Sequence, residues 1–221
     1  MQRREFLTAT AALGTAAVAG CLGGGDANPD VVLAEPDRDF QSSDVAYPAW
    51  GEQIPDVTLT DPLAGTGIAV RGVDEPALLT FFYSHCQTVC PTLISTLRNV
   101  QSHAHSNGYA DGVTFAPVTF DPERDGADRL RTYAETMNVD AEAADWHFLR
   151  PDSADRARTV VKEQFGIFFE RTHPEDMDMY MFNHAAVTLL VNGDSYVERA
   201  YRTKTPDEEA IIDDLRRVRA A

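Results

Sequence analysis

The alternation of apolar runs with helical patterns limits the fold of this chain more than any other feature. Residues 77–83 are nearly all apolar, which is typical of a strand buried on both faces of a sheet. Two further apolar runs follow, at residues 113–120 and 184–191. The segments between and after these runs carry apolar residues at helical spacing. This order predicts one α/β domain in which helices flank a central mixed β-sheet.

The expected helices begin near residues that favour a helix start. Pro91 fits the first turn of one helix, Ser153 can cap another, and residues 205–208 have a capping-box pattern before the last one. The apolar positions that define the helices are Leu93, Ile94, Leu97 and Val100; Leu130, Tyr133 and Met137; Val160, Val161 and Phe165; and Ile211, Ile212, Leu215 and Val218.

Two hairpins are expected at the ends of the domain. Residues 55–60 alternate polar and apolar side chains before a turn, so a hairpin with residues 68–71 is predicted. Asn192-Gly193 is a strong turn signal between residues 184–191 and 196–201. Residues 146–149 add a short strand-like run. The sheet is therefore expected to have an N-terminal hairpin extension and a C-terminal hairpin.

The first residues have the features of an export signal. Arg3 and Arg4 form a twin arginine, and the apolar run that follows is too short to span a bilayer permanently. Residues 18–21 resemble a lipobox, after which Cys21 is lipidated; an ordinary signal with an incidental cysteine is the alternative. We therefore expect a signal over residues 1–20, a flexible tether over 21–45 from lipidated Cys21, and a domain over 46–221. This domain would lie on the extracytoplasmic face of the cell membrane.

The charge of the chain bounds its partners. The formal net charge is -16, and an acidic surface repels phosphate, so nucleic acid is not expected as a partner. The acidic residues are scattered rather than grouped, which is typical of a solvated surface in concentrated salt. The charge therefore predicts that the organism lives in concentrated salt, and it does not indicate how the protein works.

Cys86 and Cys90 stand four residues apart where a strand passes into a helix, so both thiols can face the same way. Unpaired amides at a helix N-terminus favour a thiolate there. A purely stabilising disulfide across so short a loop removes little unfolded-chain entropy. Structural zinc usually needs four ligands, and the sequence has no second cysteine pair. The pair suits a dithiol switch or a soft-metal clamp.

Three separated stretches carry a family signature: residues 82–92, residues 121–125 and His184. Together they resemble the Sco/SenC family of copper-binding, thioredoxin-fold proteins that assist cytochrome oxidase assembly. Residues 82–92 resemble the family's strand followed by CxxxCP, and residues 121–125 match its DPxRD loop. His184 stands in the position of the family's distant copper-binding histidine. In this order the stretches cover essentially the whole exported domain.

The resemblance implies a thioredoxin-like fold and a copper site formed by Cys86, Cys90 and His184. Two thiolates suit Cu(I), and an added imidazole gives a three-coordinate site that also holds Cu(II). The implied function is delivery of copper to the dinuclear centre of cytochrome c oxidase, with the copper-binding subunit of a terminal oxidase as partner. The alternative is a thiol-disulfide oxidoreductase, in which Cys86 and Cys90 form a redox-active pair that keeps the partner's copper-ligand cysteines reduced. A peroxiredoxin-like peroxidase is a more distant candidate.

The chain departs from the family pattern at the site. The family usually has proline and aspartate where this chain has Gln87 and Thr88, and an acidic residue where it has Asn183. Neither change removes a ligand. The departures therefore bear on loop stiffness and thiolate reactivity more than on copper binding.

The remaining histidines are not expected to be ligands. His85 is expected to tune or shield the site, because consecutive residues point apart. His103 and His105 are expected on different, exposed helix faces, and His147 and His173 have no supporting neighbours in sequence. The acidic residues Asp121 and Asp125 either shape the rim of the site and influence thiol protonation, or serve as turn and capping residues.

Met177, Met179 and Met181 lie directly before His184. If this segment is extended, the three thioethers fall on one side. Because thioethers are Cu(I) ligands, they form a hypothetical secondary docking or transfer site. The alternative is that they fill gaps in the core.

Overall fold

The computed structural model describes residues 28–175 and 177–221. The predicted signal, residues 1–20, and the predicted lipidation site, Cys21, lie outside the described residues. The strands are β1 (Thr58–Asp61), β2 (Thr66–Ala69), β3 (Ala77–Phe82), β4 (Thr114–Thr119), β5 (Phe169–Thr172), β6 (Met181–His184), β7 (Thr188–Val191) and β8 (Val197–Tyr201). The α-helices are α1 (Val89–Ser106), α2 (Ala127–Met137), α3 (Ala154–Ala157), which continues as a π-helix over Arg158–Gln164, and α4 (Glu208–Val218). Within the described ranges, no helix has the length and apolar character that a membrane crossing requires.

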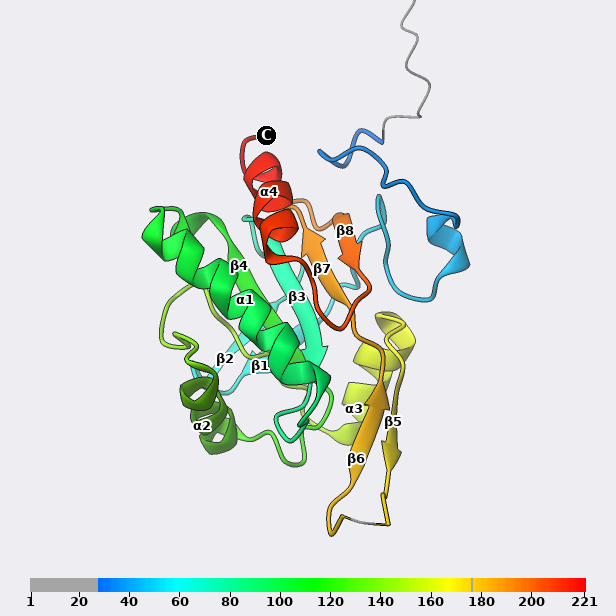
Figure 1. Ribbon diagram of the computed structural model, residues 1–221, viewed down its shortest axis with the longest axis vertical. Helices are drawn as coiled ribbons and strands as arrows, with labels where there is room; N and C mark the ends of the chain where they lie inside the picture. Colours follow the sequence, from blue (N-terminus) through cyan, green and yellow to red (C-terminus); the bar gives the residue numbers. More distant parts are fainter. Residues whose placement is uncertain (1–27, 176) are drawn as a thin grey trace, which may run out of the picture.

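The central sheet has the strand order β4-β3-β7-β8 (Figure 1). Strand β3 pairs with β4 in parallel and with β7 antiparallel, and β8 pairs antiparallel with β7. The run at residues 146–149 lies beside β4, through isolated bridges from Trp146 to Phe115 and from Leu149 to Val118. The predicted mixed sheet is therefore confirmed.

Strand β3 is buried along its whole length, and helices cover both faces of the sheet. Successive side chains of a strand point to opposite faces. Phe81 accordingly contacts Phe165 after the π-helix, with ring centroids 5.2 Å apart. Its neighbour Phe82 stacks on Tyr133 of α2 at 5.6 Å. Strand β3 is thus the centre of the core, and the loop after it starts from a fixed position.

Both predicted hairpins are present. Strands β1 and β2 pair antiparallel as the N-terminal extension, and the turn at Asn192 joins β7 to β8. Ser153 caps α3 by accepting a hydrogen bond from the Arg156 amide, as expected. The last helix differs from the prediction: Asp207, rather than Thr205, is its N-cap and accepts from the amides of Glu209 and Ala210.

The third apolar run is divided between two strands, which corrects the expectation of one strand over residues 184–191. His184 ends β6, which pairs with β5 in a separate two-stranded sheet. Strand β7 begins at Thr188 and pairs with β3. The apolar residues are continuous, but the hydrogen-bonding partner of the backbone changes from β5 to β3 within them.

The residues from Asn28 onward lie against the domain, so the predicted tether over 21–45 is too long at its C-terminal end. The fully buried Glu198 carboxylate accepts hydrogen bonds from the amides of Val32 and Leu33, each with a shortest distance of 2.8 Å. Leu33 is buried, and its carbonyl accepts from Trp50 Nε1. The boundary between tether and domain was predicted from the local composition, which is rich in turn residues. It was placed too late because Glu198, which binds this segment, lies far away in the sequence.

Replacing Glu198 with alanine should release this N-terminal arm. Hydrogen bonds to charged groups contribute about 1.5–3 kcal/mol each. Trypsin cleavage after Arg38, the first basic residue beyond Arg4, should therefore become at least about tenfold faster. Mass spectrometry of the fragments measures the rate. The exposed Glu135 gives a matched control, Glu135→Ala, and cleavage after Arg71 reports global unfolding. Equal cleavage after Arg38 in the parent and Glu198→Ala would contradict the assignment.

Candidate metal centre

The two cysteines meet at the N-terminus of α1, as the sequence predicts. The chain turns after β3 through a hydrogen bond from the Cys86 amide to the Tyr83 carbonyl, and α1 begins at Val89. Cys90 therefore lies in the first turn, where amides lack intrahelical acceptors. Its amide donates to Cys86 Sγ at 3.4 Å. Both cysteines are free and buried, with exposed fractions of 6% for Cys86 and 0% for Cys90.

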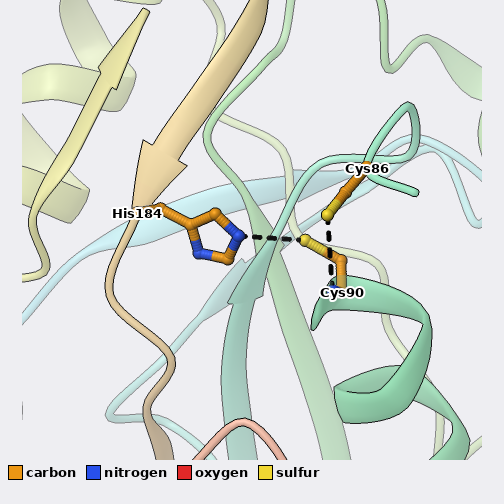
Figure 2. Close-up of side chains that lie close together, drawn as sticks. All are labelled: Cys86, Cys90 and His184. Atoms are coloured by element: carbon orange, nitrogen blue, oxygen red, sulfur yellow. Dashed lines mark hydrogen bonds between the residues drawn. The ribbon is translucent and has the colours of Figure 1, made fainter. Parts of the chain in front are cut away.

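His184 reaches the cysteine pair from the end of β6 (Figure 2). Its Nε2 lies 3.4 Å from Cys90 Sγ. The other ring nitrogen, Nδ1, lies 3.0 Å from the Ala185 carbonyl. A carbonyl only accepts hydrogen bonds, so Nδ1 carries a proton, and Nε2 is the ring nitrogen that faces the sulfurs and would bind a metal ion there. The donor atoms of the two cysteines and His184 all lie within 4.8 Å of one another.

Aromatic side chains surround the imidazole and keep one side of the site apolar. The ring of His184 lies 5.2 Å from that of Phe120 and 6.0 Å from that of Tyr83, measured between centroids. The Phe182 amide donates to the Tyr83 hydroxyl at 3.3 Å. Burial raises the pKa of Tyr83 to about 12, so the phenol is neutral. This wall limits the directions in which the imidazole can turn.

The two thiols have opposite protonation preferences. A hydrogen bond from the Cys90 thiol is the main cause that holds the pKa of Cys86 well below its usual range. Burial is the main cause that raises the pKa of Cys90, and the neighbouring Cys86 raises it further. The metal-free pair is therefore a Cys86 thiolate hydrogen-bonded to a Cys90 thiol.

The donor set is soft and three-membered. Sulfur ligands with one imidazole suit copper, whereas structural zinc sites usually have four protein ligands. A hollow of about 380 Å³ opens beside His184, lined among others by Thr88, Asn183 and Lys204. Among the three potential ligands, His184 lines this hollow and the two cysteines do not.

A second group of potential ligands, His85, Asp121 and Asp125, lies next to the first. Its carboxylates already have internal donors. Asp125 accepts from the Ser84 amide and hydroxyl, and Asp121 accepts from Arg124 and from the Tyr180 hydroxyl. His85 faces Ser84 and Asp125 rather than the sulfurs. These contacts support the loops around the cysteines, and the Asp125 charge contributes to the raised pKa of Cys90. The two aspartates therefore shape the rim of the site, and the capping interpretation is wrong because Gly126 is the N-cap of α2.

The histidines that were not expected to be ligands make contacts away from the cysteine pair. His103 is half-buried against the Tyr109 hydroxyl, and the exposed His105 pairs with Asp145. His147 pairs with Asp61, a contact that its sequence neighbours did not indicate. In the described ranges, none of these histidines belongs to a group of three potential ligands.

Two of the three methionines before His184 lie outside the core. Met177 and Met179 are 41% and 44% exposed, and only Met181, at the start of β6, is partly buried. The core-filling interpretation is therefore wrong for the first two. The chain also bends at Asp178 and Met179, so the extended arrangement that would align three thioethers does not form.

Sequence reasoning missed several residues that support the site. Ser84 connects Asp125 to the loop before Cys86, and the Arg129 guanidinium donates to the Ser84 hydroxyl and carbonyl. Tyr180 lies against Arg124. The position of Ser84 directly before His85 and Cys86 was the one available signal, because loops next to a site often carry supporting polar groups.

Comparison with known protein families shows which family the chain belongs to. A sequence model of the SCO1/SenC family matches residues 70–220, more than half of the chain. The chain belongs to the SCO1/SenC family. SCO2-like proteins from Rickettsia prowazekii and Rickettsia typhi are each 24% identical to it, over 119 and 129 residues. These matches cover 52% and 57% of this chain, and 53% and 58% of the relatives. The chain thus spans about half the length of the curated relatives that it matches.

Solved structures show the same fold. Copper-bound ScoI from Arabidopsis thaliana has 20% identity and a TM-score of 0.61, covering 76% of this chain and 99% of its own. A SCO1/SenC family lipoprotein from Bacillus anthracis has 21% identity and a TM-score of 0.62, covering 77% and 95%. BsSco, described with a disulfide switch and as a member of the Sco family of cytochrome c oxidase assembly proteins, has 18% identity and a TM-score of 0.60, covering 80% and 98%. The predicted thioredoxin-like fold is therefore confirmed.

In the reduced, metal-free SCO1/SenC domain, iodoacetamide should modify Cys86 before Cys90, because the thiolate is the reacting form. Cys90→Ala removes the thiol that stabilises the Cys86 thiolate. The alkylation profile of Cys86 should then move to higher pH by at least about one unit. Initial rates measured by mass spectrometry across the acid and neutral range give the profile. Cys90→Ser keeps a donor and should shift it less; an unchanged profile in Cys90→Ala would contradict the hydrogen-bonded pair.

Proposed function

We propose that this chain is a lipid-anchored, extracytoplasmic copper-binding protein that delivers copper to the dinuclear centre of cytochrome c oxidase during assembly. The observation that carries the proposal is the convergence of Cys86, Cys90 and His184, whose donor atoms lie within 4.8 Å of one another. Arabidopsis ScoI has a structure with copper bound, and BsSco is described within a family of cytochrome c oxidase assembly proteins. These relatives support both the metal and the partner.

The chemistry of the site fits a copper ion in transit. The Cys86 thiolate and the Nε2 lone pair of His184 are ready to bind, and a soft ion would replace the proton of Cys90. Three ligands leave room for a fourth ligand from a partner. The hollow beside His184 supports approach of such a ligand from the histidine side, and copper would then leave by stepwise ligand exchange.

The location is proposed from the N-terminal sequence. Lipidated Cys21 would hold the domain at the extracytoplasmic face of the cell membrane, and the Bacillus anthracis relative is described as a lipoprotein. The net charge of -16 fits an environment of concentrated salt, which screens repulsion among the acidic groups. The partner is the copper-binding subunit of a terminal oxidase.

A thiol-disulfide oxidoreductase is the second candidate. Two free, adjacent cysteines form a thiolate-thiol pair, and BsSco is described with a disulfide switch. In this reaction the Cys86 thiolate attacks a disulfide of the partner's copper-ligand cysteines, and Cys90 resolves the mixed disulfide. Two electrons pass to the partner, whose disulfide becomes one thiol, carrying the Cys90 proton, and one thiolate, which takes a proton from water, while Cys86 and Cys90 become a disulfide. His184 is not needed as a metal ligand in this role.

Copper titration of the reduced domain tests the main proposal. The parent should bind one copper ion tightly, with sulfur-to-copper charge-transfer absorbance for Cu(II). His184→Ala removes one of three ligands and should weaken Cu(II) binding by about 10–100-fold or more. His103→Ala, which changes a histidine elsewhere on α1, is the matched control and should bind like the parent. A parent that binds no copper would overturn the proposal.

Two transfer reactions separate the candidates. Copper-loaded protein is mixed with a metal-free, reduced dinuclear copper domain, and reduced, metal-free protein is mixed with the same domain in its disulfide form. A copper chaperone transfers metal in the first reaction, and His184→Ala impairs it. A reductase reduces the disulfide in the second, and His184→Ala leaves the yield unchanged. Disulfide reduction without any copper transfer would favour the oxidoreductase.

A further inference from the structure

The hairpin that carries His184 is a separate unit. Strands β5 and β6 form their own two-stranded sheet and are not among the strands of the central sheet (Figure 1). A two-stranded hairpin alone is marginally stable. The position of His184 relative to the cysteines, which follow β3, therefore depends on side chains that join the hairpin to the central domain.

Arg124 makes one such connection, from the loop after β4. Its Nε donates to Asp121 Oδ2 at 2.5 Å, which fixes the guanidinium within its own loop. Its Nη1 donates to the carbonyl of Tyr180 at 3.0 Å, one residue before β6. The guanidinium also lies over the Tyr180 ring, 3.6 Å from the centroid. One planar side chain thus holds both the backbone and the ring of Tyr180.

Tyr180 is fixed from its other sides as well. Its hydroxyl donates to Asp121 Oδ1 at 2.8 Å. Arg171 of β5 lies 4.0 Å from the ring centroid and pairs with Glu123 of the same loop. The ring is therefore held between two guanidinium groups and one carboxylate. Tyr180 lies four residues before His184, and β6 occupies most of that distance as regular strand.

The loop that holds Tyr180 also holds the cysteine side of the site. Asp125, at its end, accepts hydrogen bonds from the amide and hydroxyl of Ser84, two residues before Cys86. Residues 121–125 therefore join the loop that carries the cysteines to the strand that carries His184. They do so through Ser84 and Tyr180, not through contacts with the sulfurs or the imidazole.

We propose that Arg124 and Tyr180 are positioning residues for His184, holding β6 so that the imidazole reaches an ion bound by Cys86 and Cys90. This inference rests on the proposed copper site and deepens it. Phe182 also joins β6 to Tyr83. Without the Arg124 contacts the start of β6 is held less tightly, and the contribution of His184 to binding falls. The cysteines still hold the ion, since their positions depend on Asp125 and α1.

A double-mutant cycle in the whole reduced domain tests this role. Cu(II) affinity is measured for the parent, Arg124→Ala, His184→Ala and the double variant. In the parent background His184→Ala should weaken binding at least about tenfold, and in the Arg124→Ala background less than about threefold. The nitrogen hyperfine signature of Cu(II) in electron paramagnetic resonance should weaken in Arg124→Ala. The matched control Arg131→Ala removes an exposed arginine of α2 and should leave the full effect of His184→Ala.

The thermal stability of the metal-free variants separates positioning from a merely structural role. If Arg124 has only a structural role, Arg124→Ala lowers the thermal stability, but His184→Ala still weakens Cu(II) binding by the same factor as in the parent and the nitrogen signature is unchanged. This outcome overturns the positioning role and leaves the proposed function standing. If Arg124→Ala does not fold, the same cycle with Tyr180→Phe decides, because this variant loses only the hydroxyl bond to Asp121. The His184→Ala factor should then shrink partially, and an undiminished factor overturns the inference. A parent that binds no copper overturns the proposed function and this inference together.

Discussion

The buried carboxylate of Asp125 joins the ends of the two central parallel strands. Its side chain has no exposed surface, and it accepts hydrogen bonds from the Ser84 amide and hydroxyl and from the Thr119 hydroxyl. A buried carboxylate is tolerated when such donors replace water. Ser84 lies just after β3 and Thr119 ends β4, so Asp125 fixes the start of the loop that carries Cys86. The positions of the cysteine pair and of the first turn of α1 follow from this anchor.

Of the two residues in the cysteine loop that depart from the family pattern, Thr88 contacts a thiol. The Thr88 hydroxyl lies 3.6 Å from Cys86 Sγ, where the family usually has a carboxylate. A hydroxyl can donate to a thiolate, whereas an ionised carboxylate repels it. Stabilising the thiolate favours the reduced form of the pair over the disulfide. The Thr88 backbone also donates a hydrogen bond that lowers the pKa of Cys86.

The sequence predicted the elements whose patterns are local. The buried strand at β3, the helix with Pro91 in its first turn and the Asn192 turn are all encoded by neighbouring residues. The break between β6 and β7 was not predicted, because residues 184–191 keep their apolar character while the pairing partner changes. The docking of residues 28–45 was missed for a similar reason, since Leu33 and Glu198 are 165 residues apart in the chain. In the site, the cysteines could be placed from their spacing, but His184 needed the family resemblance, and the contact of Arg124 with Tyr180 has no local signal.

X-ray absorption at the copper edge of the Cu(I)-loaded domain tests the central claim most directly, because it counts the ligands of the ion by element. The account predicts two sulfur neighbours and one imidazole nitrogen for each copper in the parent. In His184→Ala the two sulfurs should remain and the outer-shell scattering of the imidazole ring should disappear. A shell without sulfur, or imidazole scattering that persists in His184→Ala, would contradict the assignment of Cys86, Cys90 and His184 as the copper ligands.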